Sequence, residues 1–189
     1  MAKKTISMTL SAKSIQDAIK ELEKYRDSLQ AKCDLLVSRL AQIGQTAAIQ
    51  HISESPLGNT ITVRVDKATQ LMTSNAILIA TGKTVTSEDR EPFYTLLAVE
   101  FGAGIFYNST ENPKAPELGF GVGTYPGQIH AFEDGWYYWD DKTETWRYTH
   151  GIKATMPMYN AEQQIIQQYV KIAREVFGGF CVKQLGVWF

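Results

Sequence analysis

The spacing of apolar residues predicts one unusually long amphipathic helix near the start of the chain. Between residues 14 and 50, apolar side chains recur at steps that alternate between three and four, which is the period of a helix face. The members of this stripe are Ile15, Ile19, Leu22, Leu29, Cys33, Leu36, Leu40, Ile43 and Ala47. Only Arg26 interrupts the series, and no proline occurs before Pro56, so a single helix is expected over residues 14–50.

Such a helix is longer than a compact domain of this size requires. At 1.5 Å per residue it would span roughly 50 Å. Two interpretations of its apolar stripe remain open. The stripe either lies along the chain's own sheet, or it is shared between subunits, with Leu29 and Leu36 as interface residues.

The segment after this helix predicts a small, mostly antiparallel sheet. Gly58-Asn59 is a turn signal, and residues 61–65 then alternate between apolar and polar side chains. Residues 70–80 predict a second strand. Glu91-Pro92 fits the first turn of a short helix over residues 93–101, and Gly102 fits its C-terminal cap.

The rest of the chain predicts an insertion, a closing helix and a short tail. Residues 103–150 hold a glycine- and proline-rich loop followed by an aromatic hairpin. Pro157 then fits the first turn of a second amphipathic helix. Residues 180–189 form an apolar tail. We therefore expect an α+β fold within one domain over residues 1–189, in which a long N-terminal helix and a C-terminal helix pack on the sheet.

The expected hairpin concentrates three of the four tryptophans: Trp136, Trp139 and Trp146. Its first strand carries aromatic side chains on both faces, so both faces need cover. One interpretation is ordinary core packing, with the polar tips of tyrosine and tryptophan at the rim. The other is a glycan- or cell-wall-binding surface, because flat rings stack on the faces of sugars.

Composition and charge narrow the function classes. The formal net charge of −1 gives no basic surface for nucleic acid. No apolar run reaches the roughly 20 residues of a membrane span. The two cysteines, Cys33 and Cys181, lack metal-ligand spacing. No phosphate-binding loop, nucleophile motif or metal-ligand pattern occurs, so we expect no catalytic residue, cofactor or metal.

Glu100 is the one carboxylate placed inside an apolar run, Leu96–Phe101. A carboxylate there needs a partner or a position at an edge. It could serve as a general base, and an enzyme built on Glu100 and His150 is the most distant hypothesis. The favoured interpretation is that Glu100 caps backbone amides or pairs with an arginine, within the subunit or across an interface.

Two short motifs together resemble a known family. The run Val99-Glu100-Phe101-Gly102 and the later segment with Gly151, Ala154, Pro157 and Ala161 are similar to the tail-completion, or head–tail joining (neck), proteins of long-tailed bacteriophages, the minor tail protein Z-like group. The likeness is strongest over residues 97–161. Two departures remove positive charges: no arginine follows Gly58, and Met156 stands where an arginine often precedes the proline.

The resemblance implies a structural virion protein without enzyme activity. Such subunits assemble with copies of themselves into rings that complete the tail and join it to the head. The implied partners are portal or head-completion proteins on one side and tail-tube or tail-terminator proteins on the other. DNA would pass nearby without tight binding. The implied location is the tail–head junction of the virion, and the host cytoplasm during assembly.

Overall fold

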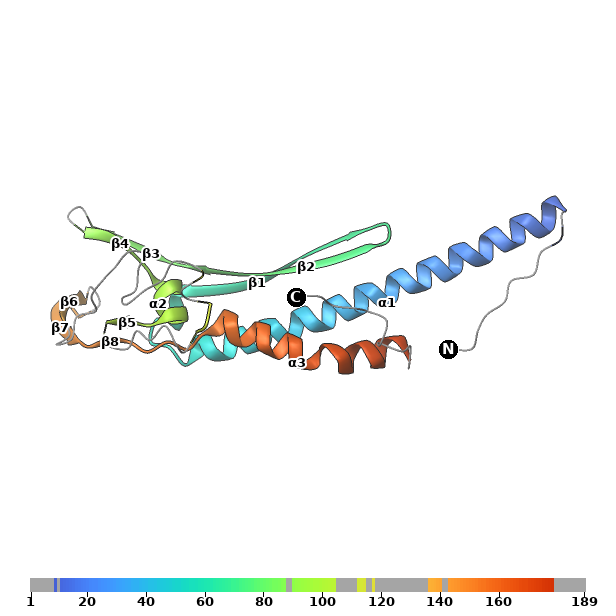
Figure 1. Cartoon of the computed structure of the whole chain (residues 1–189). Coiled ribbons are helices and arrows are strands. Elements are labelled where there is room, and N and C mark those ends of the chain that lie inside the picture. The colour runs from blue at the N-terminus through green and yellow to red at the C-terminus, as the bar shows by residue number, and fades with distance from the viewer. Residues whose placement is uncertain are drawn as a thin grey trace. The chain divides into compact units, whose positions relative to one another are not determined.

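The computed structural model describes residues 9, 11–87, 90–104, 112–114, 117, 136–140 and 143–178 (Figure 1). The elements are α1 (Ala12–Ser53), η1 (Gly58–Thr60), β1 (Ile61–Gln70), β2 (Thr73–Gly82), β3 (Thr84–Ser87), β4 (Arg90–Tyr94), α2 (Thr95–Phe101), β5 (Ala103–Gly104), β6 (Trp136–Asp140), β7 (Thr145–Thr149), β8 (Gly151–Ile152) and α3 (Pro157–Phe177). Long N- and C-terminal helices with antiparallel strands confirm the α+β prediction.

The long N-terminal helix is continuous over 42 residues, slightly beyond the predicted limits. Ser11 precedes it and supplies two hydrogen bonds to its first turn. The Ser11 carbonyl accepts from the Ile15 amide at 3.0 Å, and the Ser11 hydroxyl accepts from the Ser14 amide at 3.3 Å. A serine that satisfies first-turn amides is the usual reason for a helix to begin at such a position.

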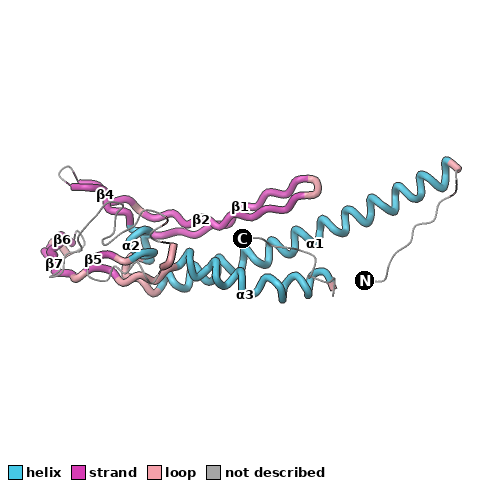
Figure 2. Tube along the Cα trace, in the orientation of Figure 1, coloured by secondary structure: helices cyan, strands magenta, loops and turns pink. Residues whose placement is uncertain are grey.

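The described strands pair as two-stranded ladders (Figure 2). β1 and β2 form a hairpin whose turn is Leu71-Met72. The pairs β3–β4, β5–β8 and β6–β7 are antiparallel. The predicted aromatic hairpin is therefore present over β6 and β7, where Trp139 is the register partner of Trp146. Most of the predicted loop before it, and the tail over residues 180–189, lie outside the described residues.

One local prediction was wrong. Glu91-Pro92 does not open the short helix; it lies in β4, which pairs with β3, and α2 begins only at Thr95. The β3–β4 register is irregular between the pairs Val85–Phe93 and Ser87–Arg90. A proline cannot donate to a strand ladder, and an irregularity of this kind accommodates one.

The chain divides into two compact units, which are described separately. The first unit comprises residues 1–43, 65–77 and 165–189. Within it, α1 contacts both other segments through polar groups. Asp34 of α1 accepts hydrogen bonds from Ser74 at 2.6 Å and from Thr69 at 3.2 Å. Arg39 of α1 pairs with Glu175 of α3 at 2.8 Å.

The second unit comprises residues 44–64 and 78–164 and contains the main apolar cluster. Ile52, Ile61 and Val99 are buried there, and Leu57, Val63 and Leu96 pack against them. Gly82 makes a close approach possible, because a Cβ atom at this position would lie 2.7 Å from the backbone nitrogen of Leu96. The end of α1, the start of β1 and α2 thereby form one core.

Candidate functional site: a buried carboxylate at a helix joint

The short helix α2 carries Glu100 into the core of the second unit. Its first residue, Thr95, donates two hydrogen bonds to the Lys83 carbonyl, from the amide at 3.1 Å and from the hydroxyl at 2.9 Å. Thr95, Ala98, Val99, Glu100 and Phe101 are all buried. Glu100 is therefore a buried residue, with 7% of its surface exposed.

The Glu100 carboxylate accepts hydrogen bonds from the first turn of α3. Its Oε2 accepts from the Met158 amide at 2.9 Å, and its Oε1 accepts from the Tyr159 amide at 3.1 Å. These amides have no partner within the helix, and the helix dipole places partial positive charge there. The carboxylate thus caps α3 from a helix 57 positions earlier in the chain, counted from Glu100 to Pro157.

The same segment of α2 also accepts hydrogen bonds from the backbone amides just before α3. The Val99 carbonyl accepts from the Thr155 amide at 2.9 Å and from the Met156 amide at 3.4 Å. Pro157 has no amide hydrogen, and the Asn160 amide bonds to the Met156 carbonyl at 2.9 Å. Every backbone donor from Thr155 to Asn160 therefore has a partner, as buried backbone groups require.

The residues that follow α2 and the residues that precede Lys153 pair as a short antiparallel β-ladder. Ala103 pairs with Ile152 and Gly104 pairs with Gly151 in β5 and β8. We call the hydrogen-bonded residues Val99–Gly104 and Gly151–Tyr159 the helix joint. Gly102 makes the change from helix to strand possible, because its φ of 79° and ψ of 171° belong to a region open essentially only to glycine.

Asn112 completes the shell around the carboxylate. Its side chain is 3% exposed and donates to Glu100 Oε1 at 3.0 Å. The Asn112 Oδ1 accepts from the Lys114 amide at 3.1 Å, and the Lys114 ammonium bonds to Glu162 on α3 at 2.7 Å. The loop is thus tied to α2 through the buried Asn112 side chain and to α3 through the exposed Lys114–Glu162 pair.

Burial raises the pKa of Glu100 above its ordinary value. The Met158 and Tyr159 amides, the Asn112 side chain and the charge of His51 each lower this pKa and offset part of the burial effect. The ring of His150 packs edge-on against the ring of Tyr148, with the two ring centroids 5.0 Å apart. The geometry suits a carboxylate that holds two helices together, as the favoured interpretation of the sequence predicted.

The structure brings together most of the residues that the sequence singled out. Val99, Glu100, Phe101 and Gly102 lie in one segment of the helix joint, and Gly151, Ala154 and Pro157 lie in the other. Val99 and Pro157 are among the most completely buried side chains. The sequence did not identify Asn112, Met158 or Tyr159. Two of them act through backbone amides, which leave no side-chain signal, and Asn112 lies in a segment without periodicity.

The remaining predicted residues are not among the residues of the helix joint. Leu29 and Leu36 are half-buried positions on α1. Trp146 is 59% exposed on β7. Trp136 and Trp139 belong to β6, and their side chains are outside the described part of the structure.

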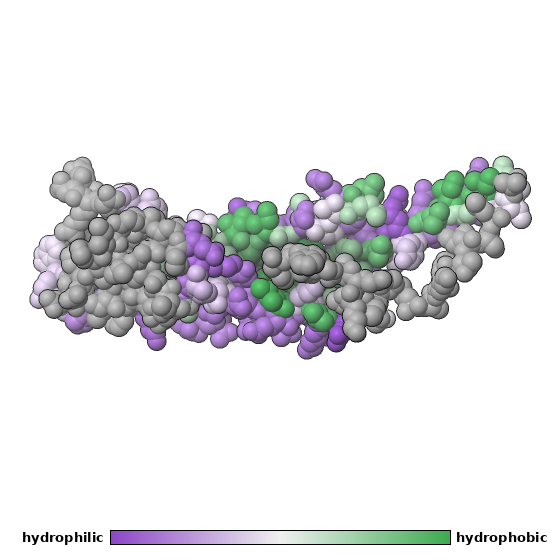
Figure 3. All heavy atoms as spheres, in the orientation of Figure 1, coloured by the Kyte–Doolittle hydropathy of each residue, from purple (hydrophilic) through white to green (hydrophobic). Residues whose placement is uncertain are grey.

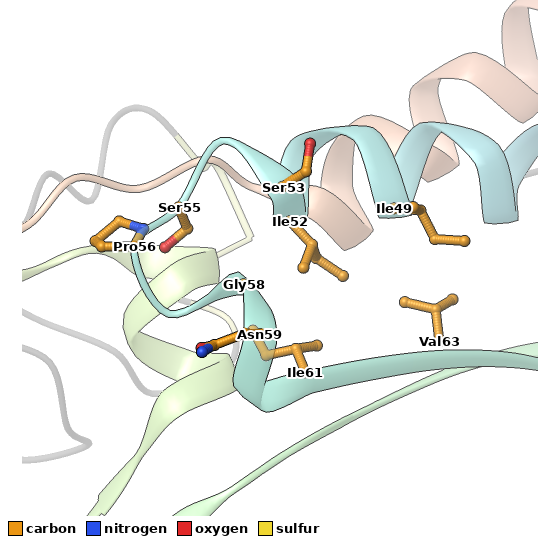
Figure 4. A pocket seen from close by; sticks show the side chains of 9 residues that line it. All are labelled: Ile49, Ile52, Ser53, Ser55, Pro56, Gly58, Asn59, Ile61 and Val63. Carbon is orange, nitrogen blue, oxygen red and sulfur yellow. The ribbon is translucent and has the colours of Figure 1, made fainter. Parts of the chain in front are cut away.

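A groove lies next to the apolar cluster of the second unit and shares Ile52 and Ile61 with it (Figure 4). Its volume is about 500 Å³. Ile49 and Ile52 from α1 and Ile61 and Val63 from β1 supply its apolar walls. Ser53, Ser55 and Asn59 also line it.

Searches of protein-family models, curated proteins and solved structures found no match to this chain. Within the described residues, no group of histidine, cysteine, aspartate and glutamate side chains could hold a metal ion. No described helix is both long enough and apolar enough to cross a membrane.

Proposed function

We propose that this protein is a structural subunit of a tailed phage or prophage, which completes the tail and connects it to the head as part of a homo-oligomeric ring. The observation that carries the proposal is an apolar stripe on α1 that its own chain leaves in solvent. Ile15, Ile19 and Leu22 are 40%, 50% and 57% exposed, and they follow one another at the spacing of a helix face.

The first unit as a whole supports an association role. Its buried apolar residues are Ala18, Ala41, Ile172 and Ala173. Its exposed large apolar residues are Ile15, Ile19, Leu22, Tyr25, Leu35, Leu71, Met72, Ile77, Ile166 and Val170. Hydrophobic residues are visible at the surface towards the N-terminal end of α1 (Figure 3). Exposed apolar residues that gather on one helix face are typical of an interaction site.

The helix joint also supports the proposal. The motifs that resemble the neck-protein family make up this joint, where their side chains and backbone groups bond to one another. Such residues have a structural role, which agrees with a ring subunit. The expected partners are further copies of the chain, portal or head-completion proteins, and tail-tube or tail-terminator proteins, at the tail–head junction of the virion.

A paired substitution on α1 tests the proposal. Ile19→Glu with Leu22→Glu adds charge to side chains that are already half exposed, so the subunit should fold normally and fail to assemble. The matched control is Lys20→Gln with Lys24→Gln, which makes the same change in net charge on exposed polar positions of the same turns. Size-exclusion chromatography with light scattering measures assembly, and thermal unfolding measures folding.

The expected result is an oligomer for the parent chain and the control, and a monomer of unchanged melting temperature for the Glu variant. A parent chain that stays monomeric up to about 100 μM, alone and with purified tails, would contradict the proposal. Weak specific association is still populated at such concentrations.

A second candidate function is favoured by the aromatic hairpin. Tyr137, Trp146 and Tyr148 are 63%, 59% and 48% exposed, and the Tyr137 and Tyr148 rings lie with their centroids 5.0 Å apart. Exposed aromatic rings on one strand pair suit stacking on a sugar face. Calorimetry with chitohexaose and sedimentation with purified peptidoglycan test this function. Binding that is lost in Trp146→Ala would favour the glycan-binding module over the ring subunit.

A further inference from the structure

The distal half of the β1–β2 hairpin presents its largest apolar side chains to solvent. We define this half as residues 65–77, which belong to the first unit together with residues 1–43. Leu71 and Met72 in the turn are 74% and 64% exposed, and Ile77 on β2 is 62% exposed. None of the residues 65–77 is buried. A strand pair that is fixed on other elements ordinarily buries an apolar face there, so this half lacks the usual means of attachment.

The distal half is attached to α1 through hydrogen-bonding side chains. The Asp34 carboxylate on α1 accepts from the Ser74 hydroxyl at 2.6 Å and from the Thr69 hydroxyl at 3.2 Å. The Gln30 amide, one turn earlier on α1, donates to the Ser74 Oγ at 2.9 Å and to Asp34 at 3.2 Å. We call Gln30, Asp34, Thr69 and Ser74 the polar latch. Asp34 is its centre, because the other three side chains all donate to the same Oδ1 atom.

One further polar contact joins the distal half to α1. The Lys67 ammonium donates to the Ser38 hydroxyl of α1 at 3.1 Å. All side chains of this contact and of the polar latch are exposed or half-buried, so water can replace each partner. A hydrogen bond that competes with water contributes little net free energy. The distal half is thus held by contacts that break at low cost.

The proximal half of the hairpin is attached in a different way. It comprises residues 61–64 and 78–82, which lie in the second unit. Ile61 is buried with Ile52 in the apolar cluster, and Val63 packs against this cluster. Separation of these side chains would expose apolar surface to water, which is unfavourable. The hairpin therefore has a firmly attached base and a weakly attached end.

We infer that the distal half of the hairpin is a releasable arm, which the polar latch holds on α1 and which leaves α1 while the second unit stays folded. Segments with few buried apolar contacts and exposed hydrogen bonds are the ones that open locally at low free energy. Leu71, Met72 and Ile77 move with the arm, so its release changes the position of these exposed apolar side chains. The inference goes beyond the proposed ring and does not depend on it, because it concerns a single folded chain.

Distances between two spin labels on one chain test the inference. Cys33 and Cys181 are first replaced by serine. Ala31→Cys on α1 and Asn75→Cys on the arm then carry the labels, since both positions are exposed. The labelled chain is mixed with an excess of unlabelled chain, so that only distances within one chain are measured.

A second label pair is the matched control. Gln50→Cys on α1 and Thr62→Cys on β1 are also exposed positions, but both lie in the second unit. This pair should give one distance in every variant. The arm pair should give a docked distance and a released distance, because the arm opens without the second unit.

Two variants change the latch in opposite directions. Asp34→Ala removes the shared acceptor of three hydrogen bonds, so the ratio of released to docked arm should rise about tenfold. Asp34→Leu with Ser74→Val places apolar side chains on both sides of the contact. Such paired replacement is nearly neutral or stabilising, so the ratio should return to the parent value or fall below it.

Two outcomes would overturn the inference. One is a single, unchanged distance for the arm pair in both the parent chain and Asp34→Ala, which would mean that the latch does not control the position of the arm. The other is a control pair that broadens together with the arm pair, because the second unit would then open as well. Neither outcome bears on the ring, which Ile19→Glu with Leu22→Glu tests separately.

Discussion

Glu100 is the residue whose chemistry most directly determines local stability. Glutamine at this position would keep one acceptor oxygen and place an NH₂ group against a backbone amide of α3. A buried donor would then lack an acceptor, which costs about 1–3 kcal/mol. We expect Glu100→Gln to lower the free energy of unfolding by this amount in urea titrations. The control Glu162→Gln removes only an exposed pair with Lys114 and should cost under about 1 kcal/mol.

The stability that Glu100 contributes should also depend on pH. Burial raises its pKa in the folded chain, so over the window between its unfolded and folded pKa the folded state binds the proton more readily. The free energy of unfolding therefore falls as the pH rises through this window. The stability of the parent chain relative to Glu100→Gln should be greatest near pH 4 and decrease towards neutral pH, as measured by parallel urea titrations. A difference that increases with pH would show that the hydrogen bonds outweigh burial.

Gly102 is required for its backbone geometry. Alanine would have to adopt a φ of 79° with a ψ of 171°, so Gly102→Ala should destabilise the protein by about 1–3 kcal/mol. Gly178→Ala is the matched control, because Gly178 also has a positive φ, 60°, but a Cβ atom there would meet nothing within 4 Å. Thermal unfolding should show the larger decrease for Gly102→Ala. Equal decreases would indicate that the helix joint tolerates other backbone conformations.

At the scale of elements, Asp34 fixes the register between α1 and the β1–β2 hairpin. Its Oδ1 accepts from Ser74, Thr69 and Gln30, and these bonds, led by Ser74, lower the pKa of Asp34. Asp34→Ala should therefore increase hydrogen exchange of the amides of residues 69–74 without unfolding the second unit. Asp27→Ala is the control, because the Asp27 carboxylate bonds to the neighbouring Arg26. An increase of the same size in both variants would exclude the register role.

The sequence predicted the helices with a regular apolar period, but it did not predict the contacts that are made through backbone groups. The step of three and four predicted α1, and Pro157 predicted the start of α3, because both features act within one helix. β3 and β4 were missed because Glu91-Pro92 reads equally well as a helix start, and only the pairing with residues 84–87 decides the choice. The position of Glu100 in an apolar run predicted that its carboxylate has a buried partner. The identity of this partner depends on which helix start packs beside Glu100.

At the scale of the whole molecule, the charge distribution bears on the proposed function at the tail–head junction, where DNA would pass nearby. The chain has 19 lysines and arginines against 20 aspartates and glutamates, and Lys3-Lys4 is its only pair of adjacent basic residues. Affinity for duplex DNA requires several clustered cations and falls steeply with salt. If the proposed function is right, the protein does not hold the phosphates of the DNA, so we expect no measurable duplex binding at physiological salt.

Fluorescence anisotropy with a labelled duplex measures this property. The matched control is Glu21→Lys with Glu23→Lys, which converts residues 20–24 into a basic run on the exposed end of α1. This variant should bind the duplex with an affinity that decreases as the salt concentration increases. Such binding would show that the assay detects phosphate contacts. The parent chain should show no binding. Micromolar, salt-sensitive binding by the parent chain would contradict the proposed function, in which DNA passes nearby without tight binding.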